Sequence, residues 1–442
     1  MTDSAASAPT TGVGPGRWSA WRVVWWFGFV SLAADMVYEG ARSMYGPLLA
    51  SLGATAVVVG LVTGAGEAMA LVLRLVFGPL ADRTGRYWGL TIIGYGLTAV
   101  CVPLLAVTPF VGGAGLVLAS VLILLERSGK AVRSPSKSAL LAHVASAVGR
   151  GRGFGVHKAL DQVGAFAGPL LVAGVIAATG AIWPSMAVLA IPGTAAMLLL
   201  AVIRSHVPDP SVYDVDAPEA ASTSSTPVAV AVPGGEPARR GLRGWFADAV
   251  GSGLPREFFG YALAAGLMTG GLVTFGIIGY HLTVEGLVPV ATVPIVYAGA
   301  MGVEALAALG VGLVYDRHGG AVLYAVPVLV ALVPPLALSG SVALSLVGVA
   351  VWGLAYGVQD STVKALVAEV VEAPRRATAY GVFAGVQGAF AIVGGLVSGW
   401  LYDRSLPVLV GVVAVSQLVA LVLLARTVRT LHPDRVTTGP LE

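Results

Sequence analysis

Charged side chains recur inside long apolar stretches of this sequence, at the spacing of one helix face. Asp35, Glu39 and Arg42 stand at positions i, i+4 and i+7 of such a stretch, so a helix would place them together. An ionisable group at bilayer depth costs about 2.5–3.5 kcal/mol or more unless it faces a cavity or a partner. Two carboxylates on one face could share and release a proton, which proton-coupled transport requires. Permanent neutralisation of Glu39 by Arg42 would instead make the trio structural, and both interpretations remain open.

Further ionisable and amide groups lie in other apolar stretches. The spacing lets Asp161 meet His157 one helical turn away, in a trio with Lys158 that suits an inner gate as well as a substrate site. Asp360 and Lys364 are also four residues apart and could simply neutralise each other. The proton-coupling candidates are Asp35, Glu39, Arg42, Glu67, Asp161, Glu304 and Asp360. The substrate-cavity candidates are Arg74, Arg127, His157, Lys158, Gln162, Lys364 and Gln387.

The elements that must position these groups are membrane-spanning helices. The 442 residues are 56% hydrophobic and 11% charged, against about 25% charged in soluble domains. The apolar runs have the length of about 20 residues that crosses about 30 Å of hydrocarbon. They predict an all-α membrane protein with about twelve spans, at roughly 21–49, 57–81, 88–108, 111–132, 154–178, 181–203, 256–284, 289–315, 321–338, 341–370, 379–402 and 406–427.

A polar, proline-rich stretch divides these spans into two sets of six. It predicts a flexible cytoplasmic linker at 205–255 between bundles at 21–204 and 256–427, with cytoplasmic tails at 1–20 and 428–442. Basic residues fall in alternate loops, which indicates that both termini are cytoplasmic. The loops assigned to that side carry, among others, Arg83, Arg86, Arg133, Lys137, Arg150 and Arg152.

The two sets of helices are also internal repeats. One constant shift superposes Ala139 and Leu140 on Ala365 and Leu366, Arg150 on Arg376, and Gly168 on Gly394, without a gap. Duplicated membrane halves usually enclose a site at the midplane between them and alternate its exposure by rocking. The repeat therefore predicts two pseudo-symmetric bundles around a central site.

The segment Gly78-Pro-Leu-Ala-Asp82-Arg83-Thr-Gly85-Arg86 follows the second expected span. It resembles the signature loop of the major facilitator superfamily, and the resemblance covers essentially the whole chain. It implies two six-helix bundles and a conformational gate, formed here by Gly78, Asp82, Arg83, Gly85 and Arg86, with Asp316, Arg317 and Gly319 as a degenerate second copy. We expect Gly78 to allow close helix approach and Asp82 to accept hydrogen bonds from a helix N-terminus.

A second motif concerns the direction of transport. Gly164-x-x-x-Gly168-Pro169 is similar to the first part of a motif of proton-driven exporters, although Val172 and Ala173 replace its closing glycine pair. Ordinary small-residue packing would use the same residues. The prediction is proton-coupled export of a small solute, with import or facilitation of a small polar or anionic solute as the alternative. A membrane sensor or channel is a remoter one.

Other classes of function are disfavoured. Cys101 is the one cysteine, so no intrachain disulfide or cysteine metal cage can form. Gly129-Lys130 lacks the flanking residues of a phosphate-binding loop, and the sequence has no nucleophile or zinc motif, so we expect no enzyme and no cofactor. The formal charge of +3 follows from loop topology rather than nucleic-acid binding. The expected partners are a small-molecule substrate, protons and the lipid bilayer, for a monomer in a prokaryotic cytoplasmic membrane.

Overall fold

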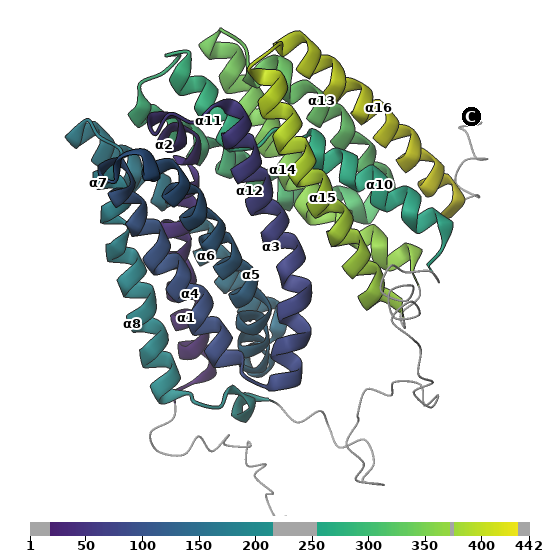
Figure 1. Ribbon diagram of the computed structural model, residues 1–442. Coiled ribbons are helices and arrows are strands. Elements are labelled where there is room, and N and C mark those ends of the chain that lie inside the picture. The colour runs from purple at the N-terminus through teal and green to yellow at the C-terminus, as the bar shows by residue number, and fades with distance from the viewer. Residues whose placement is uncertain (1–17, 215–253, 372–374, 432–442) are drawn as a thin grey trace, which may run out of the picture.

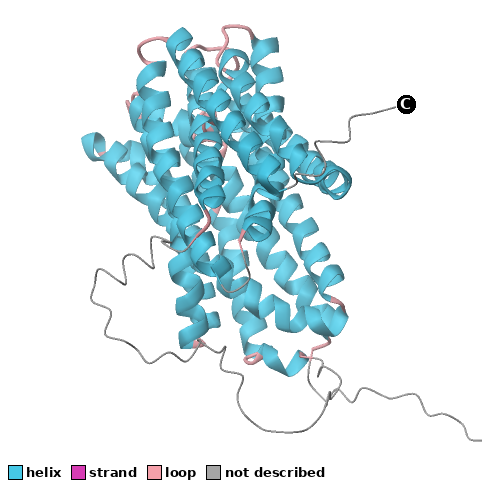
Figure 2. Cartoon of the chain, turned by 90° about the vertical axis from the view of Figure 1, so that its right-hand side faces the viewer, coloured by secondary structure: helices cyan, strands magenta, loops and turns pink. Residues whose placement is uncertain are grey.

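The computed structural model describes residues 18–214, 254–371 and 375–431, and within those ranges the regular elements are helices without a strand (Figure 2). Residues 1–17 and 432–442 of the expected tails at 1–20 and 428–442, and residues 215–253 of the expected linker, lie outside the described residues. The all-α class is confirmed.

The helices form two groups that follow the order of the chain (Figure 1). The first half contains α1 (Ala20–Arg42), α2 (Tyr45–Ser51), α3 (Ala56–Thr84), α4 (Tyr87–Leu104), α5 (Gly115–Val148), α6 (Arg150–Thr179), α7 (Trp183–Val188) and α8 (Ala190–His206). The second half contains α10 (Arg256–Gly271), α11 (Phe275–Val284), α12 (Val293–His318), α13 (Ala325–Ala337), α14 (Val342–Val370), α15 (Arg376–Tyr402) and α16 (Leu406–Leu431). Short 3-10 turns join several of them.

Ten spans in the described part of the chain are long and apolar enough to cross a membrane. The expected span at 321–338 corresponds to a shorter apolar helix, Val322–Ala337. The span expected at 111–132 lies in α5, which carries five Lys, Arg or Glu residues. The chain is therefore an integral membrane protein, and the count of twelve spans remains a prediction at these two helices.

One expected span of the second half is broken in the middle. The run predicted at 256–284 divides into α10 and α11, because Leu272 adopts an extended conformation. A broken helix at membrane depth is tolerated only where its freed backbone groups find partners. Trp352 provides one, since its indole Nε1 donates to the carbonyl oxygen of Val273 over 2.8 Å.

The prediction of a loop from 133 to 153, between the fourth and fifth spans, is wrong. Helix α5 continues through Pro135 to Val148, and α6 begins at Arg150 after a single residue, Gly149, whose φ is +89°. Arg133 is 3% exposed and donates to Thr98 Oγ1, and Lys137 donates to Ser31 Oγ over 3.0 Å. These two cations face the interior of the first half, so they carry no information on loop topology.

The start of the expected linker is also part of the first half. Helix α8 extends to His206, and the turn Pro210–Tyr213 lies against α5. The Tyr213 hydroxyl donates to the carbonyl oxygen of Trp18 over 2.7 Å, and Trp88 Nε1 donates to that of Pro208 over 3.0 Å. The first half therefore includes the residues from 205 to Asp214, which the sequence assigned to the linker.

The halves meet backbone to backbone at one end, which we call the closed end. There a Cβ added to Gly60 would fall on the carbonyl oxygen of Gly395, and one added to Gly46 on that of Gly276. Helices α3 and α15 lie side by side there and diverge toward their other ends, which we call the open end (Figure 1). Toward the open end of α3, Val76 and Leu80 are exposed. Glycine at these contacts is what allows the halves to approach so closely.

Candidate functional site

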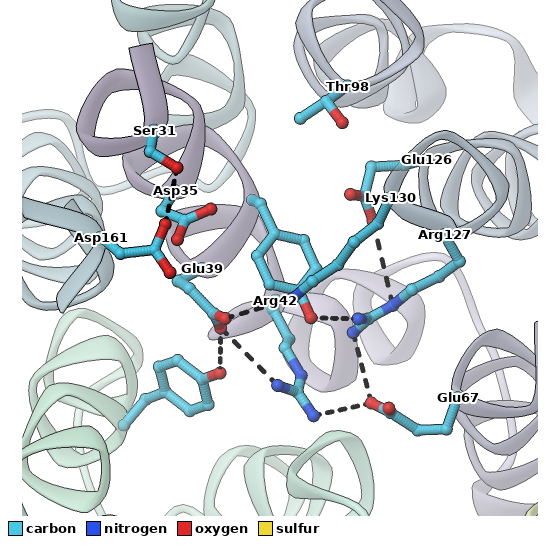
Figure 3. Close-up of polar contacts among 12 residues, drawn as sticks. Ser31, Asp35, Glu39, Arg42, Glu67, Thr98, Glu126, Arg127, Lys130 and Asp161 are labelled. Atoms are coloured by element: carbon cyan, nitrogen blue, oxygen red, sulfur yellow. Dashed lines mark hydrogen bonds and ion pairs between the residues drawn. The ribbon is translucent and has the colours of Figure 1, made fainter. Parts of the chain in front are cut away.

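One carboxylate of α1 has donors from three helices. Glu39 is buried, with its Oε2 3.7 Å from Arg42 Nη1 and its Oε1 3.9 Å from Lys130 Nζ on α5. The hydroxyl of Tyr297 on α12 donates to Glu39 Oε2 (Figure 3). Glu39 is therefore bound by Arg42 on its own helix, by Lys130 on α5 and by Tyr297 on α12 of the other half.

The network continues from Arg42 into the core of the first half (Figure 3). Arg42 Nη2 donates to Glu67 Oε1 over 2.6 Å, and Arg127 Nη2 lies 3.5 Å from the same oxygen. Arg127 Nε lies 3.9 Å from Glu126 Oε2, which also accepts from the Tyr45 hydroxyl over 3.2 Å. Arg42 is thus closer to Glu67 than to Glu39. Buried ions need such pairing, because an unpaired one would carry the full cost of desolvation.

A second polar cluster surrounds Ser31, nearer the open end of α1. Ser31 Oγ donates to Asp161 Oδ1 over 2.7 Å and accepts from Lys137. Asp161 Oδ2 also lies 3.4 Å from Lys158 Nζ. His157 Nε2 lies 3.5 Å from Ser31 Oγ, so both His157 and Asp161 contact this serine, whereas the sequence predicted a direct contact between the two.

Asp35 belongs to this second cluster. Its Oδ1 lies 3.8 Å from Arg133 Nη2, and its carboxyl group is adjacent to that of Asp161 (Figure 3). Asp35 and Glu39 are therefore on one helix face, as predicted, but form ion pairs with different cations.

A cavity lies between the halves and contains about 890 Å³ of empty space, including the part open to solvent. The first half contributes Arg42 and Glu67 to its wall, and the second half contributes polar and aromatic groups. Gln359 and Gln387 both donate through Nε2 to Thr269 Oγ1, over 2.8 and 3.1 Å. The remaining wall includes Trp352 and Tyr356, which stack 5.3 Å apart between ring centroids, and Asp360.

The other candidates fall into three groups. Arg74 Nε and Glu304 Oε2 are buried and have no hydrogen-bond partner among the described residues. Gln162 is half-buried on α6. The side chains of Asp316, Arg317 and Lys364 lie outside the described residues, as does the environment of Gly319.

Both glycine motifs lie on helices of the first half. A Cβ at Gly164 or Gly168 would fall on backbone oxygens of Leu32 or Met36, so the motif that includes Pro169 packs α6 directly against α1. By contrast, a Cβ at Gly78 would meet only Pro135, at 3.9 Å, so the close approach expected there is absent in this conformation.

Sequence reasoning missed several members of the network. Glu126, Lys130, Arg133 and Lys137 recur at i, i+4, i+7 and i+11 of α5, a pattern that could have assigned them to one helix face. Tyr297 and Tyr356 carried no comparable signal, because an aromatic residue in an apolar run is ordinary.

The signature loop is exposed at the open end. Asp82, Arg83, Gly85 and Arg86 are all exposed, and Gly85 ends α3 with a φ of +62°. Asp82 Oδ1 accepts from the Tyr87 hydroxyl at the start of α4 over 3.1 Å, in place of the predicted backbone donor.

We expect Asp82→Asn to slow turnover several-fold and to leave solute affinity unchanged, because the loop can engage the other half only when the open end closes. Turnover and binding are measured separately in reconstituted vesicles and by ligand-dependent stability. Asp403→Asn, at another exposed aspartate, is the matched control. Equal loss of binding in Asp82→Asn would contradict a gating role.

Long apolar helices in two halves, with a polar cavity between them and a charged network beside it, define a membrane transporter. The Major Facilitator Superfamily profile matches residues 27–323, and the chain belongs to that family. It is 48% identical over 407 residues to an uncharacterised protein of Mycobacterium tuberculosis, covering 92% of this chain and 93% of that protein. An uncharacterised MFS-type transporter of Methanocaldococcus jannaschii is 28% identical over 148 residues, 34% of this chain and 36% of that one.

Solved transporters share the fold. A mutant of the nucleoside transporter NupG has a TM-score of 0.69 at 14% identity, over 92% of this chain and 99% of that chain. A POT family transporter in complex with 5-aminolevulinic acid has a TM-score of 0.65 at 13% identity, over 94% and 97%. At such identities the likeness concerns the fold alone.

Proposed function

We propose that this transporter exports a small solute in exchange for protons, by alternating exposure of the cavity between its halves. The observation that carries the proposal is a polar cavity bordered by Arg42 and Glu67, between halves whose backbones meet at the closed end. Binding at such a midplane site and rocking of the halves is how duplicated carriers work. The proposal assigns the chain no chemical reaction.

The open end is proposed to face the cytoplasm of a prokaryotic cell. Exposed basic residues at that end support this orientation, namely Arg83, Arg86, Arg150 and Arg152. The same orientation places both termini in the cytoplasm. A solute would then enter the cavity from the cytoplasm and leave at the closed end after it opens.

The cavity wall favours a polar solute that is not an anion. The guanidinium group of Arg42 is already paired with Glu67 and Glu39. Glu67 is neutralised in the same ion pairs, so the Gln359, Gln387 and Thr269 groups give the wall mainly neutral hydrogen-bonding capacity. Ligand sites use a few such polar groups among apolar ones to orient their ligand.

Proton coupling is proposed to depend on the carboxylates of α1. We expect Asp35→Asn and Glu39→Gln to abolish accumulation driven by a pH gradient and to preserve solute-for-solute exchange, which needs the conformational cycle without net proton movement. A thermal-shift screen first identifies a solute, because a ligand raises apparent stability by mass action. Both transport modes are then measured in vesicles, with Asp403→Asn as the control.

The same assay tests the direction of transport. Everted vesicles with an acidic interior should accumulate the solute if the chain is an exporter. Accumulation only in right-side-out vesicles would support the importer instead, and equilibration without a gradient would support a facilitator. Gradient-driven accumulation by both α1 variants would move the coupling role to Glu67, Asp161, Glu304 or Asp360.

A further inference from the structure

A buried hydrogen bond connects the two halves next to the cavity. Tyr297 on α12 is 0% exposed and Glu39 on α1 is 8% exposed, and the tyrosine hydroxyl donates to Glu39 Oε2. A second tyrosine of the other half, Tyr356 on α14, lies with its ring centroid 5.4 Å from the guanidinium carbon of Arg42. The charged face of α1 is therefore in direct contact with the second half.

The hydrogen bond lies toward the closed end. Glu39 is one turn before the C-terminus of α1, and Tyr297 is in the first turns of α12. Nearby, the hydroxyl groups of Thr63 and Thr274 form another hydrogen bond between the halves, over 2.8 Å. When the closed end opens, α12 has to move away from α1, and the contact between Tyr297 and Glu39 has to break.

The charge of Glu39 is balanced by its surroundings. Three carboxylates and three cations form the network, namely Glu39, Glu67 and Glu126 with Arg42, Arg127 and Lys130. Glu39 also interacts electrostatically with Tyr38 on its own helix and with Glu304 on α12. Asp35 acts on it indirectly, because Lys130 interacts with both carboxylates. Adding a proton to Glu39 would leave the network with one excess positive charge, which is costly in a buried site.

We propose that Tyr297 is a latch between the halves whose strength depends on the charge of Glu39. An ionised carboxylate accepts a hydrogen bond about twice as strong as a neutral acceptor does. Ionised Glu39 therefore holds the closed end shut through Tyr297. A proton on Glu39 removes the charge, weakens the hydrogen bond and favours opening of that end. This inference rests on alternating access, and it makes Tyr297 a positioning residue for the coupling step.

The test measures the conformational equilibrium directly. Spin labels are attached at Ser51→Cys and Glu285→Cys across the closed end, or at Thr84→Cys and Thr378→Cys across the open end, in a Cys101→Ala background. All four labelled positions are exposed. Distance distributions of the full-length purified protein are recorded in lipid nanodiscs at about pH 8 and about pH 5, without solute.

Three results are expected. In the protein with Tyr297 and Glu39 intact, the short distance between the labels across the closed end dominates at high pH, and the fraction of molecules with that distance falls at low pH. Tyr297→Phe, which removes the hydroxyl and keeps the ring, shifts the open-to-closed ratio by about ten-fold toward the open state at high pH. Combined with Glu39→Gln it adds a smaller shift than it causes alone, because Glu39→Gln has already weakened the same hydrogen bond by removing the charge of the acceptor.

The matched control is Tyr402→Phe. The Tyr402 hydroxyl is 2.8 Å from His281 Nδ1, a contact within the second half, so its loss should leave the distances between the halves unchanged. Equal shifts in Tyr297→Phe and Tyr402→Phe, or no shift in Tyr297→Phe, would overturn the latch. If Tyr297→Phe does not fold, Glu39→Gln alone must show the same opening and lose the pH response.

The latch and the proposed function fail in different ways. The distance measurement needs no substrate and no assumed direction of transport. A pH-independent exporter would keep the contact between Tyr297 and Glu39 but show no shift with pH, whereas a proton-coupled importer would show the shift in full. The vesicle assays decide between these cases.

Discussion

Arg42→Gln is expected to abolish transport and to lower the free energy of unfolding by about 3–5 kcal/mol, the usual cost of removing one partner of a buried ion pair. The physical reason is the position of Arg42 between two carboxylates. It pairs with Glu67 at 2.6 Å and lies 3.7 Å from Glu39, and the Arg42 side chain itself is buried although it borders the cavity. Without the guanidinium group, Glu67 keeps Arg127 at 3.5 Å, and Glu39 keeps Lys130 at 3.9 Å and the hydrogen bond from Tyr297.

The stability of Arg42→Gln is measured by thermal unfolding in detergent, and its activity by solute flux in vesicles. Arg204→Gln, at an exposed arginine in the last turn of α8, should retain both. The double variant Arg42→Gln with Glu67→Gln should recover much of the stability, because no unpaired charge is left at Glu67. It should not recover transport, because transport requires the ion pair itself. Full transport by Arg42→Gln would rule out this role.

Gly60→Val and Gly395→Val are expected to stop transport by preventing the closed end from forming. A Cβ at either residue would fall on the carbonyl oxygen of the other, so the added side chain has no space unless α3 and α15 move apart. Both residues are on spanning helices, where valine is favourable for membrane insertion. The effect should therefore be conformational, with correctly folded protein held open at the end that is closed here.

The readout is the distance across the closed end, between labels at Ser51→Cys and Glu285→Cys, together with solute flux. Gly174→Val is the matched control, because a Cβ at this glycine of α6 would have no atom within 4 Å. Transport at the normal rate in either interface variant would show that the two helices need not meet during the cycle.

The spanning helices and the family were predictable from local features. Their lengths follow from the thickness of hydrocarbon that each must cross, and the segment from Gly78 to Arg86 identified the family before any contact was known. Two predictions were wrong for the same reason: the placement of Arg133 and Lys137 in a loop, and the end of the fourth span at 132. Arg133 and Lys137 were assigned to a loop because cations are expected outside the membrane, but buried partners compensate both cations and let α5 continue to Val148.

Only some of the polar members of the site were predictable. Asp35, Glu39 and Arg42 were placed on one face correctly, because helical spacing is a local property. The sequence could not show that Arg42 is closer to Glu67 than to Glu39, or that Asp35 and Glu39 belong to different clusters. Those partners are on other helices, and their proximity depends on how the helices pack.

By itself, the sequence determined that this protein spans a membrane, consists of two related halves and keeps ionisable groups among apolar ones, because each of these properties follows from residue type and spacing. Only the tertiary structure decided which charges are paired, where the cavity lies and which end is closed. These depend on contacts between residues far apart in the chain, such as Gly60 with Gly395 and Glu39 with Tyr297. Those contacts form because glycines allow the backbones to approach and because a buried charge is costly unless it is paired. Neither cause has a local pattern in the sequence.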